Sequence, residues 1–111
     1  LKRFAHILKT GVREVDFVGR IGGEEFLAIF PEINMKDARV ICERIRETVE
    51  KTHFPGEEKL PTRKVTVSIG VSGRGKGVRY EGSHEKLMRA LLKDADKKLY
   101  EVKSHGRNGV R

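Results

Sequence analysis

The stretch of sequence that organises this chain is residues 20–30, Arg-Ile-Gly-Gly-Glu-Glu-Phe-Leu-Ala-Ile-Phe. Two adjacent glycines between two apolar runs predict a β-hairpin with its turn at Gly22-Gly23, because glycine takes positive φ angles without the steric penalty of a Cβ atom. Glu24 and Glu25 follow the glycines directly. If both begin the return strand, they point to opposite faces of the sheet, and only one of them addresses a given site. Taken alone, the segment favours a surface hairpin with two exposed glutamates.

The residues around this turn predict a larger sheet. We expect residues 16–21 to form the first strand of the hairpin and residues 25–30 to form the second. The second strand is apolar on both faces, which is typical of a strand covered on both sides. Residues 65–71 alternate Val or Ile with Thr, Ser and Gly, and they predict a further strand. One face of that strand carries only small residues, so we expect another part of the chain to approach it closely.

Three helices complete the pattern. Apolar residues recur every three or four positions in residues 1–13, in residues 35–51 and in the segment after Ser83. Asn34 and Ser83 are the predicted N-caps of the second and third helices, and Gly106 is the predicted C-terminal stop of the third. Helices that alternate with strands in this way indicate the α/β class, as a layered α+β sandwich.

Composition narrows the functional classes. The chain has 111 residues and a formal net charge of +8, which favours an anionic partner. It has no apolar run long enough to cross a bilayer, and a single cysteine, Cys42, indicates a reducing, cytoplasmic compartment. The few aromatic residues do not interleave with the basic ones, which argues against a platform for single-stranded nucleic acid. Residues 72–82 are glycine-rich and basic but lack the spacing of a P-loop, so we expect a solvated loop there.

Two pairs of charged residues have alternative interpretations. Arg13 and Asp16 lie three positions apart before the hairpin. They form either an ion pair at a helix end or a site for guanine, in which the guanidinium donates to O6 and N7 and the carboxylate accepts from the N–H groups. Lys103 and Arg107 lie four positions apart at the end of the last helix. They either complement the helix dipole or hold a phosphate between them.

Four short blocks of sequence carry a resemblance to a known family. They are residues 16–26 (Asp-Phe-Val-Gly-Arg-Ile-Gly-Gly-Glu-Glu-Phe), 65–71 (Val-Thr-Val-Ser-Ile-Gly-Val), 95–103 (Ala-Asp-Lys-Lys-Leu-Tyr-Glu-Val-Lys) and 106–108 (Gly-Arg-Asn). Together they resemble the GGDEF domain of diguanylate cyclases, in the family's order and over nearly the whole chain. The resemblance implies a ferredoxin-like, nucleotidyl-cyclase-type sheet with helices packed on it. It also implies synthesis of cyclic di-GMP from two GTP molecules, presented by two domains that meet face to face.

The resemblance also implies roles for residues at the hairpin. Gly22 and Gly23 would let the nucleotide lie against the turn, where a side chain would block it. Glu24 would hold Mg²⁺ (or Mn²⁺) and favour deprotonation of the attacking ribose 3′-hydroxyl, and Glu25 would support that site. The metal would neutralise phosphate charge and align attack on the α-phosphate.

The remaining matches concern phosphates and product. Lys103 and Arg107 match positions that neutralise the GTP phosphates. Arg13 and Asp16 match the family's RxxD inhibitory site for cyclic di-GMP. Arg44 falls where a second arginine often completes that site from a neighbouring domain. Product binding there would couple two distant sites and lock the domains in an unproductive arrangement.

The chain also departs from the family at its start. The family's first strand and helix, which carry an aspartate for Mg²⁺ and two residues for guanine, have no counterpart before Leu1. We therefore expect residues 1–111 to be a partial GGDEF domain, truncated at the N-terminus, that is inactive alone although its parent is active. A sheet that lacks a strand exposes edges. We accordingly expect a homodimer or higher oligomer, and any membrane attachment only through upstream domains.

Two alternatives stay open at this point. One is a cyclic di-GMP receptor that keeps Arg13 and Asp16 but has no turnover, and the intact Gly-Gly-Glu-Glu-Phe signature argues against it. The other is a basic nucleic-acid-binding domain, which the net charge suggests and which would bind in a salt-dependent way. The lack of stacking aromatic residues argues against that second class, so we expect no nucleic-acid partner.

Overall fold

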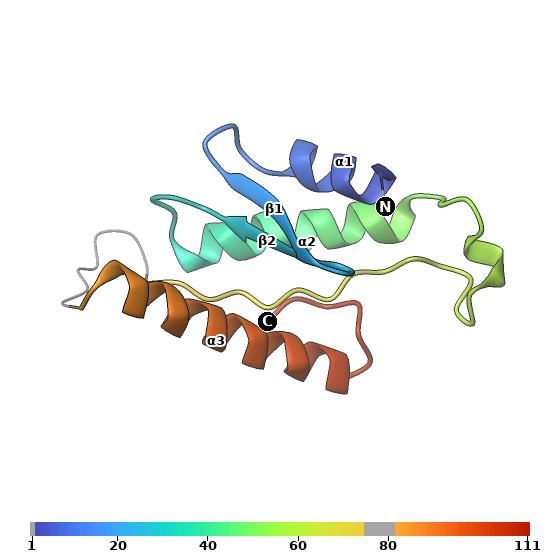
Figure 1. Ribbon diagram of the computed structural model, residues 1–111. Helices are drawn as coiled ribbons and strands as arrows, with labels where there is room; N and C mark the ends of the chain where they lie inside the picture. The colour runs from blue at the N-terminus through green and yellow to red at the C-terminus, as the bar shows by residue number, and fades with distance from the viewer. Residues whose placement is uncertain (1, 75–81) are drawn as a thin grey trace.

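The structure is a computed structural model, and it describes residues 2–74 and 82–111 (Figure 1). Its elements, in chain order, are α1 (Lys2–Gly11), β1 (Phe17–Gly22), β2 (Glu25–Ile29), α2 (Met35–Lys51), the 3₁₀ helix η1 (Glu57–Lys59) and α3 (His84–Ser104). The predicted α/β class is confirmed. Most of the glycine-rich segment, residues 75–81, lies outside the described residues.

The turn of the hairpin lies one residue later than predicted. β1 pairs with β2 in antiparallel register, with Gly22 opposite Glu25, so the turn is Gly23-Glu24 and not Gly22-Gly23. A register shift just before Gly22 adds one residue to β1. Gly23 has a φ of 41°, and it is the glycine that the turn requires. Glu24 lies in the turn and only Glu25 lies in the strand. The expectation that the two side chains point to opposite faces of the sheet therefore does not apply.

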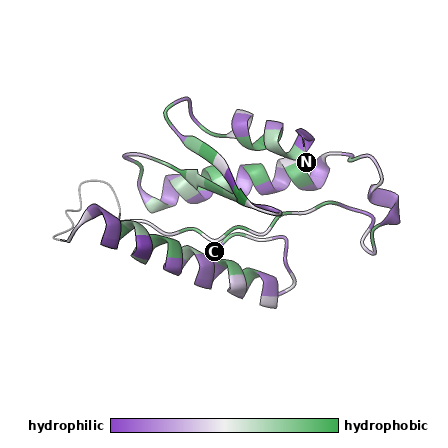
Figure 2. Cartoon of the chain, viewed as in Figure 1, coloured by the Kyte–Doolittle hydropathy of each residue, from purple (hydrophilic) through white to green (hydrophobic). Residues whose placement is uncertain are grey.

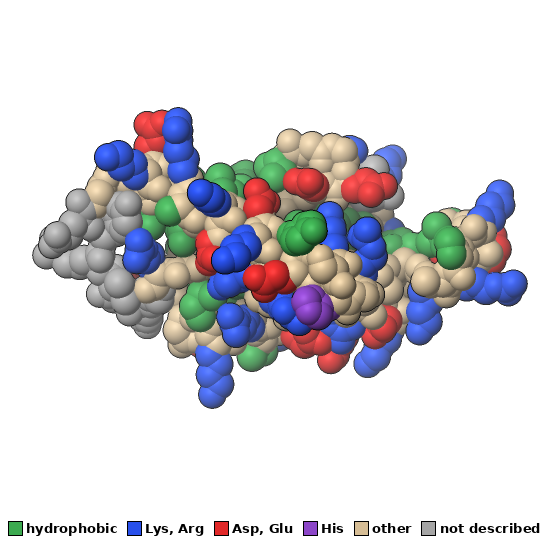
Figure 3. Space-filling model, turned by 90° about the horizontal axis from the view of Figure 1, so that it is seen from below, with side chains coloured by type: hydrophobic (Ala, Val, Ile, Leu, Met, Phe, Trp, Pro, Cys, Tyr) green, Lys and Arg blue, Asp and Glu red, His purple; other side chains and the backbone are tan. Residues whose placement is uncertain are grey.

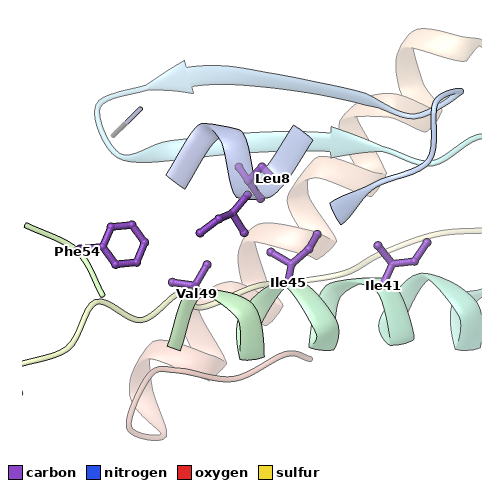
Figure 4. Packing of buried hydrophobic residues seen from close by; sticks show 6 residues of the cluster. Leu8, Ile41, Ile45, Val49 and Phe54 are labelled. Atoms are coloured by element: carbon purple, nitrogen blue, oxygen red, sulfur yellow. The ribbon is translucent and has the colours of Figure 1, made fainter. Parts of the chain in front are cut away.

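The core lies between α1, α2 and one face of the hairpin. The buried apolar stripe of α2 is the predicted one: Ala38, Ile41, Cys42, Ile45 and Val49. Figure 4 shows the last turns of this stripe packed against Leu8 of α1 and against Phe54, which follows α2. Phe26 of β2 adds an edge-to-face contact with Phe4 of α1, with ring centroids 5.1 Å apart. Burial raises the pKa of the Cys42 thiol to about 11, so this cysteine is a core residue and not a reactive one.

The prediction that β2 is covered on both faces is wrong for the described chain. The sheet has two strands, and Figure 2 shows apolar residues along both of them. Val18 and Phe26 face the core, whereas Phe17 and Ile29 pair on the opposite face and remain 57% and 37% exposed. The sequence predicts the apolar character of this second face correctly. No other described segment covers it.

Residues 65–71 are extended but do not form the predicted strand. Their pairing among the described residues is one parallel bridge, between Ile69 and Val110. Val65, Val67 and Ile69 pack against the core, so the apolar face of the segment lies where the alternation predicts. A strand requires a neighbour that exchanges backbone hydrogen bonds along its length. The C-terminal tail supplies such a neighbour for only a few residues, and the hairpin supplies none.

The expected close approach to this segment is confirmed at Gly70. A Cβ atom built on Gly70 would lie 2.1 Å from the carbonyl oxygen of Ala95 and 2.6 Å from the amide nitrogen of Leu99, both in α3. The segment therefore runs between α2 and α3, as Figure 1 shows. Because α3 rests on a single extended segment rather than on a sheet, its apolar stripe is only half-buried, and Val102 is its one buried residue.

The helix boundaries follow the predicted caps. The side chain of Asn34 accepts a hydrogen bond from the amide of Asp37, and that of Ser83 accepts one from the amide of Lys86. Gly106 follows α3 with a φ of 99°. Within the ranges that the structure describes, none of the helices has the length and apolar character that a bilayer crossing requires.

An ion pair ties α1 to the start of the hairpin. Arg13 binds both carboxylate oxygens of Asp16, with Nη2 to Oδ1 at 2.7 Å and Nε to Oδ2 at 3.1 Å. The backbone amide of Arg13 also donates to Asp16, and its Nη2 donates to the carbonyl of Pro31. Burial by itself raises the pKa of Asp16, but the hydrogen bonds and charge of Arg13 outweigh burial, and the net pKa is lowered. The ion pair is thus present, and the hydrogen bond from Arg13 to Pro31 joins the α1–β1 connection to the β2–α2 loop.

We predict that Gly70→Ala destabilises the fold by about 1–3 kcal/mol, because the added Cβ would overlap the backbone of α3. Urea unfolding measures the change. Gly22→Ala is the matched control, since a Cβ at Gly22 meets nothing within 4 Å, and its free energy of unfolding should stay within about 0.5 kcal/mol of the parent. Equal unfolding midpoints for Gly70→Ala and the parent chain would contradict the described packing.

We predict that acid weakens this fold partly through Asp16. A carboxyl whose pKa is lowered by folding contributes stability that is complete above its unfolded pKa, about 3.9, and is lost as the pH falls through the folded pKa. Asp16→Asn should therefore be less stable than the parent at neutral pH, and the difference should shrink as the pH drops below about 4. Urea unfolding across this range tests it. The control Asp96→Asn removes one exposed carboxylate and should keep the parent's acid sensitivity; a constant difference for Asp16→Asn would refute the assignment.

Candidate functional site

The hairpin turn is an exposed backbone surface with two carboxylates. Glu24 and Glu25 are both exposed, and Arg20 holds the turn by donating from Nε to the carbonyl of Gly23 at 2.8 Å. Gly22 does not have a positive φ, and an added Cβ there would meet no other described part of the chain within 4 Å. The chain's own contacts and conformation therefore give no reason for glycine at this position. A bound molecule that lies against the backbone is a physical reason for it.

The end of α3 presents two cations. Gly106 takes the left-handed conformation, and the amide of Arg107 donates to the carbonyl of Val102 at 2.9 Å, which together make a Schellman motif. Arg107 occupies the position that in this motif often carries an apolar residue. The side chains of Lys103 and Arg107 are exposed, and neither makes an ion pair with the part of the chain that the structure describes.

The hairpin turn and the C-terminal end of α3 lie toward the same end of the molecule in two different views (Figures 1 and 4). Figure 3 shows the molecule from below, with Lys and Arg side chains over most of this face and Asp and Glu among them. The net positive charge on this face is therefore spread out. Recognition of an anion accordingly depends on particular basic residues more than on one basic patch.

Arg13 and Arg44 line one open cleft between the α1–β1 connection and α2. Its volume is about 420 Å³, and its other lining residues are Glu32, Ile33, Asn34, Asp37, Val40 and Ile41. The structure thus brings together two of the three residues predicted for product binding. The third, Asp16, has a fully buried side chain whose carboxylate faces Arg13 and does not line the cleft.

Sequence reasoning assigned no function to two acidic residues of this cleft. Glu32 and Asp37 give its wall hydrogen-bond acceptors beside the two guanidinium groups. The sequence placed Asp37 only as part of a helix start, and the structure confirms that the amide of Asp37 is capped by Asn34 at 2.8 Å. Asp37 lies one turn after the cap residue Asn34 and on the same helix as Arg44. That shared helix is the signal in the sequence that could have indicated a place for Asp37 in the cleft.

A third residue that sequence reasoning missed is Asn108. Its side chain joins the C-terminal turn to α2 by accepting from Arg46 at 3.0 Å and donating to Glu50 at 2.6 Å. The hydrogen bond from Asn108 and the neighbouring Arg46 lower the pKa of Glu50. The signal in the sequence was the Gly-Arg-Asn triplet directly after the helix, which we used only as a resemblance.

The donor groups at the hairpin suit a magnesium ion only in part. Among residues 2–74 and 82–111, no three His, Cys, Asp or Glu side chains gather as a ready-made metal cluster. Mg²⁺ is commonly bound by one or two carboxylates together with water and substrate phosphates. Glu24 and Glu25 can supply these one or two carboxylates. The chain's residues are therefore compatible with a metal that arrives with a nucleotide.

Comparison with known proteins identifies the family. The family model described as "Diguanylate cyclase, GGDEF domain" matches residues 1–109. Response regulator PleD of Caulobacter vibrioides is 41% identical over 111 residues, which is 99% of this chain and 23% of PleD. Diguanylate cyclase A of Treponema denticola is 36% identical over 110 residues, 99% of this chain and 27% of that protein. The chain thus spans about a quarter of the length of these relatives.

A solved structure shows the same fold. It is the diguanylate cyclase SiaD of Pseudomonas aeruginosa, crystallised in complex with its activator SiaC. The match has a TM-score of 0.62 and 23% sequence identity, and it covers 97% of this chain and 38% of SiaD. At this identity the likeness supports the fold alone, and it agrees with the α/β arrangement described above. From the family match over residues 1–109 and the identity with its relatives, we conclude that this chain belongs to the GGDEF domain family of diguanylate cyclases.

Proposed function

We propose that this chain forms the hairpin and phosphate-binding part of a GTP site that serves the synthesis of cyclic di-GMP. The observation that carries the proposal is Gly22, an exposed glycine whose conformation and surroundings in the chain do not require glycine. A nucleotide that lies against this backbone would explain it. Family membership supports GTP as that nucleotide, since Diguanylate cyclase A of Treponema denticola is among the relatives.

At the turn, the proposed chemistry is proton removal beside a phosphate. Glu24 and Glu25 are free of ion pairs with the described residues, so their carboxylates are available to a ligand. We assign Glu24 to hold Mg²⁺ (or Mn²⁺), with Glu25 in support. When bound there, the metal would neutralise phosphate charge. Glu24 itself favours loss of the proton from the ribose 3′-hydroxyl, because a carboxylate within reach can accept it.

At the end of α3, the proposed role is phosphate neutralisation. Lys103 and Arg107 extend from a helix terminus without ion-pair partners among the described residues. Lys103 lies in the last turn of α3 and Arg107 in the turn that follows it, so two exposed cations stand at one helix end and attract an anion there. Arginine also binds phosphate through two parallel hydrogen bonds. The triphosphate of GTP is the anion that this proposal assigns to them.

The cleft beside α2 is the proposed product site. Arg13 and Arg44 supply guanidinium donors on its wall, and Glu32 and Asp37 supply acceptors. Guanine presents acceptors at O6 and N7 and donors at its N–H groups, so this combination suits it. In this proposal Asp16 acts by fixing Arg13, because its own carboxylate is buried against that residue. The same cleft also suits a receptor of cyclic di-GMP without turnover, which stays the second candidate function.

We predict that Gly22→Ala and Lys103→Ala each weaken GTP binding about tenfold or more, which corresponds to about 1.4 kcal/mol. In the first variant a methyl group occupies the place of the nucleotide, and in the second a phosphate loses a cation. Isothermal titration calorimetry with GTP and Mg²⁺ measures both dissociation constants.

Lys93→Ala is the matched control for this experiment. Lys93 is an exposed lysine of the same helix, outside the proposed site, and its removal should leave the affinity for GTP unchanged. The free energy of unfolding of Gly22→Ala shows whether a loss of GTP affinity comes from the lost nucleotide contact or from loss of the fold. Unchanged GTP affinity in both site variants would disprove the proposed GTP site.

We predict that Arg44→Ala weakens cyclic di-GMP binding about tenfold, as does Arg13→Ala, because each removes a guanidinium from the cleft. Calorimetry with cyclic di-GMP is the measurement. Arg44→Ala is the cleaner variant, since Arg44 does not touch Asp16, whereas loss of Arg13 also leaves that buried carboxylate without its ion pair. Arg39→Ala, an exposed arginine of α2 outside the cleft, is the control. Binding undiminished by Arg13→Ala would sink the assignment.

The other expectations from the sequence stay predictions. They are the inactivity of the isolated 111-residue chain, its assembly into a homodimer or higher oligomer, its cytoplasmic location and the lack of a nucleic-acid partner. A GTP turnover assay of the purified chain tests the first, and light scattering tests the second.

A further inference from the structure

We infer that Asn108 is a positioning residue that holds Arg107 where a nucleotide phosphate can reach it. The inference rests on the proposed function in one respect, namely that Arg107 contacts phosphate. The positioning itself follows from contacts within the chain. Asn108 lies next to Arg107 and joins three separate parts of the fold.

The backbone around Arg107 adopts a disfavoured conformation. Gly106, Arg107 and Asn108 have φ angles of 99°, 64° and 48°, so three consecutive residues are left-handed. Glycine accepts this region freely and asparagine tolerates it, but an arginine pays a steric cost because of its Cβ atom. Such a conformation persists only where surrounding contacts enforce it. Asn108 makes the first such contacts on the C-terminal side of Arg107.

Asn108 uses both ends of its side-chain amide and its backbone amide. Its Oδ1 accepts from Nη1 of Arg46 at 3.0 Å, and its Nδ2 donates to Oε2 of Glu50 at 2.6 Å. Its backbone N–H donates to Oγ of Ser68 at 3.2 Å. The C-terminal turn is thereby fixed to α2 and to the extended segment at once, although Arg46 and Glu50 lie about sixty residues earlier in the chain.

The α2 residues that bind Asn108, Arg46 and Glu50, are themselves held in place by further contacts. Arg46 also donates from Nε to Glu43 at 2.7 Å and from Nη1 to Glu50 at 3.3 Å, and its side chain is only 14% exposed. These pairs lie at spacings of three and four along α2, so they run along one face of a helix that the core anchors. Asn108 therefore attaches to a rigid support.

The chain is fixed again directly after Asn108. The amide of Ile69 donates to the carbonyl of Gly109 at 2.9 Å, and the amide of Arg111 donates back to the carbonyl of Ile69 at 3.0 Å. On its N-terminal side, Arg107 is held by the hydrogen bond to Val102. Arg107 is thus the exposed residue of a short turn that is fixed on both sides, and its side chain stays available to a ligand.

Asparagine is the residue type that this role requires. It offers one acceptor and two donors on a short side chain, which match a guanidinium and a carboxylate together. Aspartate in its place would keep the bond from Arg46 but would oppose Glu50. Glycine would keep the left-handed backbone but would lose both links to α2. The Asn108→Gly variant therefore removes both side-chain links to α2 without straining the backbone, and it keeps the bond from the backbone amide to Ser68.

The test compares Asn108→Gly, Arg107→Ala and the double variant in the full chain, with calorimetry using GTP and Mg²⁺. We expect Asn108→Gly to weaken GTP binding about tenfold. We expect Arg107→Ala to weaken it at least as much and the double variant to be no weaker than Arg107→Ala, because Asn108 acts through Arg107. Lys36→Ala, which removes an exposed lysine of α2 outside this network, should leave the affinity unchanged.

A second measurement keeps the inference separate from the proposed function. Hydrogen exchange of the Arg107 amide should be faster in Asn108→Gly than in the parent chain, whether or not a nucleotide binds. A parent chain that binds no GTP would refute the proposed function, and amide exchange would then decide the positioning alone. Unchanged exchange in Asn108→Gly, or losses of GTP affinity that multiply in the double variant, would overturn the inference.

Discussion

The fold depends on the apolar stripe of α2. Ile41, Ile45 and Val49 are buried, and α1, one face of the hairpin and the extended segment all pack against them. Burial of apolar side chains stabilises a protein by about 25 cal/mol for each Å² removed from water, so this shared contact stabilises the packing of all three elements on α2. Elements far apart in the sequence meet because each contributes an apolar face to the same helix.

The polar side chains of α2 turn this core into a support for the candidate sites. Arg44 reaches the cleft that Arg13 also lines, and Arg46 with Glu50 holds Asn108 at the C-terminal turn. Both sites are therefore built against one rigid helix. The chemistry of the GGDEF family is proposed at the hairpin and at the end of α3. The hairpin packs on α2 through one apolar face, and the turn after α3 is joined to α2 by the side chain of Asn108.

Local signals in the sequence predicted the helices well. The 3.6-residue period, the capping residues Asn34 and Ser83 and the terminal Gly106 act within a few residues, so each can be recognised without the rest of the fold. The sheet was predicted less well. An alternating pattern shows that a segment has two distinct faces, but it does not show whether a partner strand exists. Residues 65–71 therefore have the predicted burial without the predicted ladder.

The sequence by itself determined the family, the helices and the presence of a glycine-bearing hairpin, because these depend on short-range pattern and on residue identity. Only the tertiary structure decided that the turn is Gly23-Glu24, that Asp16 is buried behind Arg13 and that Asn108 joins the last turn to α2. The physical reason is that these three features depend on strand register, burial and contacts across about sixty residues. Such relations are set by how the elements pack together, and no local pattern encodes them.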